Sequence, residues 1–399
     1  MNAVGIDVSK GKSTVAVMQP FGVVAASPFE VLHTENELSK LARFVKSLSG
    51  ETKVIMEYTG SYYEPIAQYL HNAGIYVCVV NAILVHDYGG NSLRKAKTDK
   101  KDAVKLACYA LDRWLDLPEF IPTDEIRKSL KLINRQYIAM GKVKTMLANN
   151  FIALTDQTYP GVNKLFSSPP RPSDGHEKWV DFAMKFSHCK RVTSLTRTAF
   201  KDKYSRWCKK NGYNFKETDA NEIYNNSATL VPTLPDSESV NLLMKQTAKQ
   251  LITTCETLCA LQKQMTELAS QLPEYRVVME MYGTGKVLGP QLMAELGDTR
   301  RFHSRKAVTA FAGLDAPPYQ SGTIDVKSRS ISKRGSPYLR KTLFQVADIF
   351  LKNKPADEPV YRFLDKKRSE GKPYKVYMIA AANKFLRIYY ARVNEMLNA

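Results

Sequence analysis

The sequence has few cysteines, and none of them forms the pairs that bind zinc or build a disulfide framework. The six cysteines are dispersed, and the only close pair, Cys255 and Cys259, has the spacing of one helix face. No apolar run reaches the roughly 18 residues that span a bilayer, and no basic segment followed by an apolar run opens the chain. These absences exclude a zinc-knuckle or disulfide scaffold and predict a soluble cytoplasmic protein with no membrane partner.

Acidic residues are also scarce, because 39 Asp and Glu face 58 Lys and Arg, which gives a net charge of +19. Residues 301–399 alone hold 20 Lys or Arg and 8 Asp or Glu. Such an excess attracts polyanions by releasing their condensed counterions. A solvated surface is the alternative explanation, but the clustering favours a basic C-terminal domain that binds nucleic acid.

The first 155 residues carry the pattern of an α/β domain. Apolar and β-branched runs predict a meander of three strands at residues 4–8, 13–18 and 22–26. Helices are expected at 35–49 and 63–73, and strands at 53–57 and 75–80. The order β-β-β-α-β-α-β is that of the RNase H/RuvC-like fold, in which the first strand is central and lies beside the fourth. Helices from 99 to 117 and from 124 to about 154 would cover this sheet.

The remaining chain is expected to be mainly helical. Residues 156–235 form a basic insertion whose aromatic residues either touch nucleic acid or build a small core of their own. Residues 236–274 show an a/d heptad seam, which favours an intermolecular coiled coil over a long helix packed within the chain. The C-terminal domain, residues 275–399, begins with a glycine turn at 283–285, which indicates either a phosphate-binding helix-hairpin-helix element or an ordinary turn.

Four carboxylates fall where a metal-dependent nuclease needs them. Asp7 interrupts an apolar strand and Glu57 ends another, and a buried carboxylate is costly unless it meets a cation. Asp99 and Asp102 have the i,i+3 spacing of one helix face. Cleavage of a phosphodiester with two metal ions requires such clustered oxygen ligands. The four residues therefore predict a Mg²⁺ or Mn²⁺ site, although each alone is more often a cap or surface residue. Three flanking lysines, Lys97, Lys100 and Lys101, are placed to meet phosphates.

Other enzyme classes fit the sequence less well. The segment from Gly5 to Ser13 has one residue too many for a phosphate-binding P-loop, and sugar kinases and actin-type ATPases need a second phosphate loop that is missing here. A tyrosine recombinase needs a cationic cluster with histidine, and His303 is the only histidine among the last 120 residues. Small serine resolvases place their serine near the N-terminus.

A basic segment in the C-terminal domain leads into a helix. Ser336 and Pro337 have the pattern of an N-cap and first helical residue, so the surrounding cations favour phosphate at the start of a helix at 338–351. These predicted nucleic-acid contacts are Lys327, Arg329, Lys333, Arg334, Arg340 and Lys341.

The motifs at both ends of the chain resemble those of the IS110 family, the bridge-RNA-guided DEDD transposases of bacterial insertion sequences, which are related to Piv-type invertases. The N-terminal motifs are Gly5-Ile-Asp-Val8, Met56-Glu-Tyr-Thr-Gly60 and Lys97-Thr-Asp-Lys-Lys-Asp-Ala103. The C-terminal motifs are Gly313-Leu314, Pro317, Ser321-Gly322, Ile331-Ser-Lys-Arg-Gly335 and Leu339-Arg340.

The resemblance implies that Ser321 is a nucleophile that forms a covalent 5′-phosphoserine link to DNA while the carboxylates and Mg²⁺ activate it. It also implies donor and target double-stranded DNA, a guide RNA, and a dimer or tetramer whose subunits share a composite site on the bacterial nucleoid. Two alternatives remain from the residues alone. One is a RuvC-like Holliday-junction nuclease in which Ser321 is incidental, and the other is a non-catalytic nucleic-acid-binding module.

Overall fold

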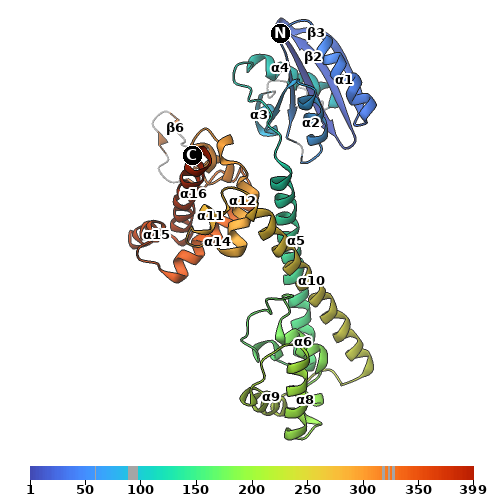
Figure 1. The fold of residues 1–399 in the computed structure, drawn as a ribbon, viewed down its shortest axis with the longest axis vertical. Helices are drawn as coiled ribbons and strands as arrows, with labels where there is room; N and C mark the ends of the chain where they lie inside the picture. The colour runs from blue at the N-terminus through green and yellow to red at the C-terminus, as the bar shows by residue number, and fades with distance from the viewer. Residues whose placement is uncertain (59, 89–97, 317–319, 322–323, 326–328) are drawn as a thin grey trace. The chain divides into compact units, whose positions relative to one another are not determined.

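The computed structural model describes residues 1–58, 60–88, 98–316, 320–321, 324–325 and 329–399. The chain divides into two compact units, residues Met1–Thr123 and Asp124–Ala399, and each is described by itself (Figure 1). Across these described ranges, no helix combines the length and apolar character that crossing a bilayer requires.

The N-terminal unit is built on a five-stranded mixed sheet. Its strands are β1 (Asn2–Ser9), β2 (Lys12–Gln19), β3 (Val23–Leu32), β4 (Thr52–Glu57) and β5 (Tyr76–Val80). They lie in the order β3-β2-β1-β4-β5, with β1 antiparallel to β2 and parallel to β4. The first strand is therefore central and adjacent to the fourth, which confirms the sheet order predicted from the sequence.

Helices cover both faces of this sheet because successive strand residues alternate between two buried faces. Val4 and Ile6 pack under α1 (Glu35–Ser47) and α2 (Glu64–Asn72), whereas Ala3 and Ile55 pack under α4 (Asp99–Asp112). The short helices η1 (Pro20–Gly22) and α3 (Ala82–Tyr88) complete the unit. Helix α4 therefore lies on the face opposite α1 and α2, where Val85 of α3 joins the same core (Figure 1).

The second unit contains an antiparallel pair of long helices, α5 (Glu125–Thr158) and α10 (Glu238–Ser270). At one end Arg127 Nη2 lies 2.5 Å from Glu274 Oε1, and at the other the Thr158 hydroxyl contacts the Met244 sulfur at 3.9 Å. The seam residue Leu251 is fully buried within the chain. The long helix is thus confirmed, but the intermolecular coiled coil is not, because the seam residues of α10 pack within the same chain, largely against α5.

The insertion between these helices folds around an aromatic core that it shares with α5 and α10. Its helices are η2 (Val162–Lys164), α6 (Lys178–Lys185), α7 (Lys190–Thr193), α8 (Arg197–Lys210) and α9 (Glu217–Thr229). Phe186, Phe200 and Tyr204 are at most 1% exposed, and Trp207 stacks on Tyr204 at 5.7 Å between ring centroids. These aromatic residues therefore build a core and do not stack on nucleic-acid bases, because their rings are buried.

The rest of the second unit is a helical domain. Its elements are α11 (Tyr275–Met279), α12 (Gly285–Leu296), η3 (Thr299–Arg301), α13 (Arg305–Ala312), β6 (Gln320–Ser321), β7 (Ile324–Asp325), α14 (Pro337–Asn353), α15 (Pro359–Ser369) and α16 (Tyr374–Asn398). Leu292, Leu343 and Phe385 lie in its buried core. In the glycine turn before α12, the buried Thr284 hydroxyl donates to the carbonyls of Val278 and Met281, so the turn is closed internally. Its phosphate-binding role stays a prediction.

Candidate active site

Asp7 and Glu57 occupy matching places on neighbouring strands. In the parallel pairing of β1 and β4, Ile6 lies opposite Met56, so Asp7 and Glu57 follow side by side at the carboxyl ends of the two strands. Each lies two residues after a position that faces α4, namely Gly5 and Ile55. Because strand side chains alternate, both carboxylates belong to the α4 face of the sheet.

Helix α4 packs directly on β1 at a position where no side chain fits. A Cβ atom at Gly5 would lie 2.0 Å from the Ala103 carbonyl oxygen and 2.6 Å from the Ala107 nitrogen. The Lys53 ammonium, at the beginning of β4, donates to the Trp114 carbonyl beyond the end of α4 at 2.8 Å. The helix therefore runs antiparallel to β1 and β4, and its N-terminus lies at the strand ends that carry the carboxylates.

The start of α4 supplies the other two acidic residues. Thr98 is the N-cap, with its hydroxyl oxygen accepting from the Lys101 amide at 3.3 Å, so Asp99 is free of that role. Asp99 and Asp102 lie in the first helical turn, and Asp99 is exposed whereas Asp102 is half-buried. Lys100 and Lys101 are exposed beside them, and Lys97 lies outside the described residues. The fold thus brings the elements that carry all four predicted carboxylates to one edge of the sheet.

This set of oxygen donors suits a hard divalent cation such as Mg²⁺, which prefers carboxylate ligands. In the parts of the chain that the structure describes, however, no group of three or more His, Cys, Asp or Glu side chains is arranged to hold a metal ion. The fold therefore brings the strand ends and the helix start together, but the four carboxylates do not converge on one point in this structure.

An ion pair that sequence analysis missed lies beside this edge. Asp7 pairs with Thr14 and Thr14 with Glu30, so Glu30 is on the same sheet face as Asp7. The Lys12 ammonium contacts Glu30 at 2.8 Å. That hydrogen bond, and then the charges of Glu30 and Asp99, raise the pKa of Lys12. The predicted third strand stopped at residue 26, whereas β3 runs to Leu32, and this shortfall hid Glu30.

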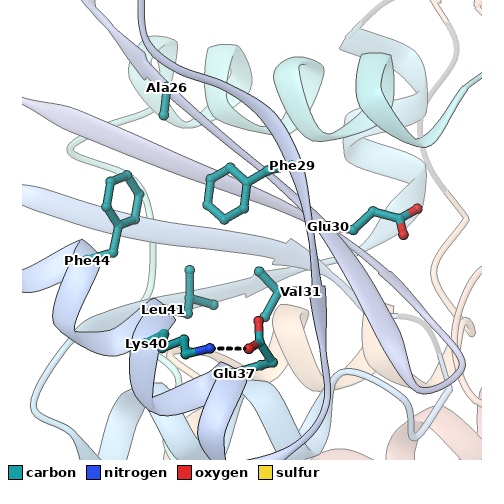
Figure 2. Close-up of a pocket in the computed structure, with 8 residues that line it drawn as sticks. All are labelled: Ala26, Phe29, Glu30, Val31, Glu37, Lys40, Leu41 and Phe44. Carbon is teal, nitrogen blue, oxygen red and sulfur yellow. Dashed lines mark hydrogen bonds and ion pairs between the residues drawn. The ribbon is translucent and has the colours of Figure 1, made fainter.

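The opposite face of the sheet holds a separate, largely apolar hollow of about 330 Å³. Figure 2 shows Phe29, Leu41 and Phe44 gathered around it and Glu30 directed away from them. The two phenyl rings meet edge to face with centroids 5.7 Å apart. Because α1 forms one wall, this hollow belongs to the face that α4 does not cover, and it is not part of the acidic edge.

The backbone of Ser321 is described in β6, where it pairs antiparallel with Ile324 of β7. Its side chain lies outside the described residues, as do Pro317, Gly322 and Lys327. The structure therefore places Ser321 at a short two-stranded element between α13 and α14.

The segment that carries Ser321 is tied together where it leaves α13 and enters α14. Ser332 donates its amide to the Asp315 carbonyl at 2.7 Å, and Lys333 donates to the Gly313 carbonyl at 3.1 Å. A Cβ atom on Gly335 would lie 2.0 Å from the Phe311 carbonyl oxygen. The two motif glycines, Gly313 and Gly335, are thus explained by close backbone approach, and together they form the base of the serine loop, residues 313–335.

The predicted nucleic-acid contacts around this base have different roles. Arg340 Nη1 donates to the carbonyls of Ala312 at 3.1 Å and Gly335 at 2.8 Å, so at least part of its guanidinium holds the loop base. The remaining described basic residues of the set are exposed: Arg329, Lys333, Arg334 and Lys341. Their side chains are accessible to phosphates, whereas Arg340 is a positioning residue for the loop.

A buried carboxylate supports the start of α14. Ser336 caps this helix by accepting from the Leu339 amide at 3.2 Å, as predicted, and its hydroxyl donates to Glu295 Oε2 at 3.1 Å. Asn134 Nδ2 donates to Glu295 Oε1 at 3.1 Å, and Glu295 is 1% exposed. Glu295 therefore joins α5, α12 and α14, and the signal for it in the sequence is a single acid within the apolar run 291–296.

Two stretches of the chain match family models of transposases. A family model described as a transposase matches residues 4–160, and a model of the transposase IS116/IS110/IS902 family matches residues 275–362. The pilin gene-inverting protein of Moraxella bovis is 23% identical over 343 residues, which are 86% of this chain and 80% of that protein. The putative transposase y4rJ of Sinorhizobium fredii is 36% identical over 114 residues, which are 27% of this chain and 28% of that protein.

Among solved structures, RuvC of Thermus thermophilus is similar at 13% identity with a TM-score of 0.23, and the match covers 29% of this chain and 95% of that one. The two family models together match both ends of the chain and leave out the insertion. The chain belongs to the IS116/IS110/IS902 family of transposases. It is therefore a DNA transposase or recombinase, as its motifs predicted.

Proposed function

We propose that the protein cleaves and rejoins DNA through a 5′-phosphoserine intermediate on Ser321, assisted by a metal site of Asp7, Glu57, Asp99 and Asp102. The observation that carries this proposal is the packing of α4 on Gly5, which brings the start of that helix to the ends of β1 and β4. Family membership supports a strand-exchange reaction, and the acidic edge is the part of the fold whose chemistry suits phosphodiester cleavage.

The four carboxylates would hold Mg²⁺ or Mn²⁺, which supplies charge stabilisation for the attacking and leaving oxygens. The Ser321 oxygen bonds to phosphorus while the bond to the 3′ oxygen breaks, and a carboxylate of the acidic edge accepts the serine proton. The 3′ oxygen leaves as a hydroxyl after it takes up a proton. Attack by the 3′ hydroxyl of another strand reverses these steps, so one phosphoester is exchanged for another without an energy source.

The partners follow from the same proposal. Donor and target double-stranded DNA are bound through phosphates by Lys100, Lys101, Lys333, Arg334 and Lys341, and a guide RNA selects the sites by base pairing. Exchange between two duplexes needs several active sites, so we propose a homodimer or homotetramer in which the serine of one subunit completes the acidic edge of another. Such an assembly works on the bacterial nucleoid.

Trapping of the covalent adduct tests the serine. In Ser321→Ala, we expect no protein-DNA adduct and no strand exchange, whereas the control Ser330→Ala, a serine of the same loop, forms the adduct as the wild type does. Persistence of adduct and exchange in Ser321→Ala would refute the mechanism. Junction cleavage by Ser321→Ala without an adduct would instead favour a RuvC-like Holliday-junction nuclease.

The acidic edge and the guide RNA are tested separately. Asp7→Asn is expected to abolish both adduct and exchange in Mg²⁺ and in Mn²⁺, and full exchange by this variant would favour a non-catalytic nucleic-acid-binding module.

Sequencing of RNA that copurifies with the protein is expected to recover one defined species. Strand exchange that survives complete digestion of this RNA would contradict the guide role.

A further inference from the structure

A basic pocket of about 340 Å³ lies between α13 and α16, apart from the basic residues of the serine loop. Its lining residues are Arg305, Lys384, Arg387, Ile388, Ala391 and Arg392. Four of these six side chains are cationic and none is acidic. Ile388 packs against the domain core, so the base of the pocket is part of the packed domain.

The lining residues of α16 share one helix face, because they recur at spacings of three and four. Lys384 and Arg392 are eight residues apart, which is about 12 Å along the helix. Phosphates recur at a regular spacing along each strand of a nucleic acid. The row of cations is therefore long enough to meet more than one phosphate of the same strand.

This row begins at the base of the serine loop. Asn383, next to Lys384, donates to the Leu314 carbonyl at 3.3 Å. Farther along α16, the Tyr390 hydroxyl donates to the Phe302 carbonyl at 2.7 Å, near the start of α13. Helices α13 and α16 therefore run antiparallel, and the pocket extends from the loop base toward the first residue of α13.

Among the described residues, the cations of the pocket have no acidic partner. Elsewhere on this domain, Arg276, Arg300 and Lys352 each lie within 3.1 Å of a carboxylate oxygen. Within the described ranges, by contrast, the pocket's arginines and lysine form no ion pair, although like charges at these spacings repel one another. A cluster of this kind is stabilised when a polyanion supplies the missing charge.

We propose that this pocket binds the phosphodiester backbone of a nucleic-acid strand and guides it to the serine loop. The proposal rests on the proposed strand-exchange function and adds a second phosphate-binding site to it. Phosphate is favoured over an acidic peptide because the chain belongs to a family of DNA transposases and because the phosphates of a strand recur regularly, which suits a row of cations; arginine can bind each of them through two hydrogen bonds. Duplex DNA and RNA share this chemistry, and the experiment separates them.

The test measures how the binding constant depends on salt. Full-length protein with Ser321→Ala, which keeps binding free of any adduct, is compared with the same protein carrying Arg387→Gln and Arg392→Gln. Each lost phosphate contact lowers the slope of log K against log salt by about 0.9 for duplex DNA and about 0.7 for a single strand. We expect the double variant to lose about 1.8 for duplex DNA or about 1.4 for single-stranded RNA, and the probe that responds identifies the bound strand.

A matched control removes the same charge elsewhere. Arg362 and Arg368 are exposed on α15, outside the pocket, so Arg362→Gln with Arg368→Gln should change the slope by less than about 0.5. Arg387→Lys with Arg392→Lys should retain most of the slope, because the charges are kept. This result would show that the loss in the glutamine variant comes from the missing charges and not from misfolding. Equal losses in the pocket and control variants, or no loss on either nucleic acid, would overturn the proposal.

A changed oligomeric state with an unchanged salt slope would also overturn it, in favour of a protein partner. The binding assay is independent of the serine chemistry. If Ser321 is not the nucleophile, the difference between pocket and control variants persists, and if the pocket is not a phosphate site, adduct formation by the wild type persists.

Discussion

Replacing Gly5 with alanine tests the contact on which the acidic edge depends. The added methyl group would lie 2.0 Å from the Ala103 carbonyl, whereas ordinary contact needs about 3.4 Å, so α4 must move by about 1.4 Å. The clash involves backbone atoms of α4, which cannot rotate away as a flexible side chain would. Asp99 and Asp102 at the start of α4 would shift with it, away from Asp7 on β1.

Overpacking a core costs about 1–3 kcal/mol, and a backbone clash of this depth belongs near the upper value. Hydrogen exchange of β1 and α4 peptides in the full chain should therefore accelerate by roughly a hundredfold, since 1.4 kcal/mol corresponds to a factor of ten. A displacement of about 1 Å at a catalytic group costs on the order of a hundredfold in rate. We expect strand exchange to fall by at least that factor while DNA binding is retained.

Gly141→Ala is the control, because nothing lies within 4 Å of a Cβ atom at this helical position. Its methyl group should leave strand exchange unchanged and stabilise α5 by roughly 0.5–1 kcal/mol. Suppose that Gly5→Ala shows the wild-type rates of both strand exchange and hydrogen exchange. Then α4 does not pack on β1 as described, and the proposed arrangement of the four carboxylates is wrong.

Two further predictions concern the second unit. Glu274→Gln should lower the free energy of unfolding by about 2 kcal/mol, since the buried Arg127 keeps Asp124 but loses its charge-assisted hydrogen bond to the buried Glu274. In chemical denaturation of the full chain, a loss no larger than the roughly 0.5 kcal/mol expected for Glu280→Gln in an exposed pair would contradict this. Although burial opposes protonation, Glu256 and Asp181 hold the pKa of His176 above its ordinary 6.5, so the insertion should be most stable below about pH 6.5 and lose this contribution as the pH rises through the raised pKa. Hydrogen exchange of the insertion from about pH 6 to about pH 8 should show this trend, and an equal trend in His176→Gln would exclude the histidine as its source.

The acidic edge could be predicted from the sequence because each carboxylate stands out locally. Asp7 and Glu57 interrupt apolar strands, and a parallel pairing of those strands places them side by side. The ion pair between Lys12 and Glu30 could not be predicted in this way, because Glu30 reaches the same face only through the register of two antiparallel strand pairs. Local patterns thus identify the residues of a strand, and long-range register decides which of them meet.

The helical unit shows the same limit in a different form. A heptad seam on α10 has the same sequence whether its partner is another subunit or α5, so Leu251 could not decide between them. Similarly, a segment dotted with aromatic residues has the same composition whether Phe200 stacks on a base or lies in a core. In both cases burial depends on segments that fold back from far along the chain. Only the family resemblance, and no local pattern, singles out Ser321.

The contacts at the far end of the long helix pair have a consequence for the evolution of chain length. Thr233 and Leu234 both donate their amides to the Gln157 carbonyl at 3.0 Å, so the chain leaves α5 and returns to α10 at nearly the same point. The core of the intervening residues also contains Phe151 of α5 and Met244 and Leu251 of α10. A short turn could therefore join the two helices without altering their register, but a chain shortened in this way would need polar residues at the positions that the branch now covers.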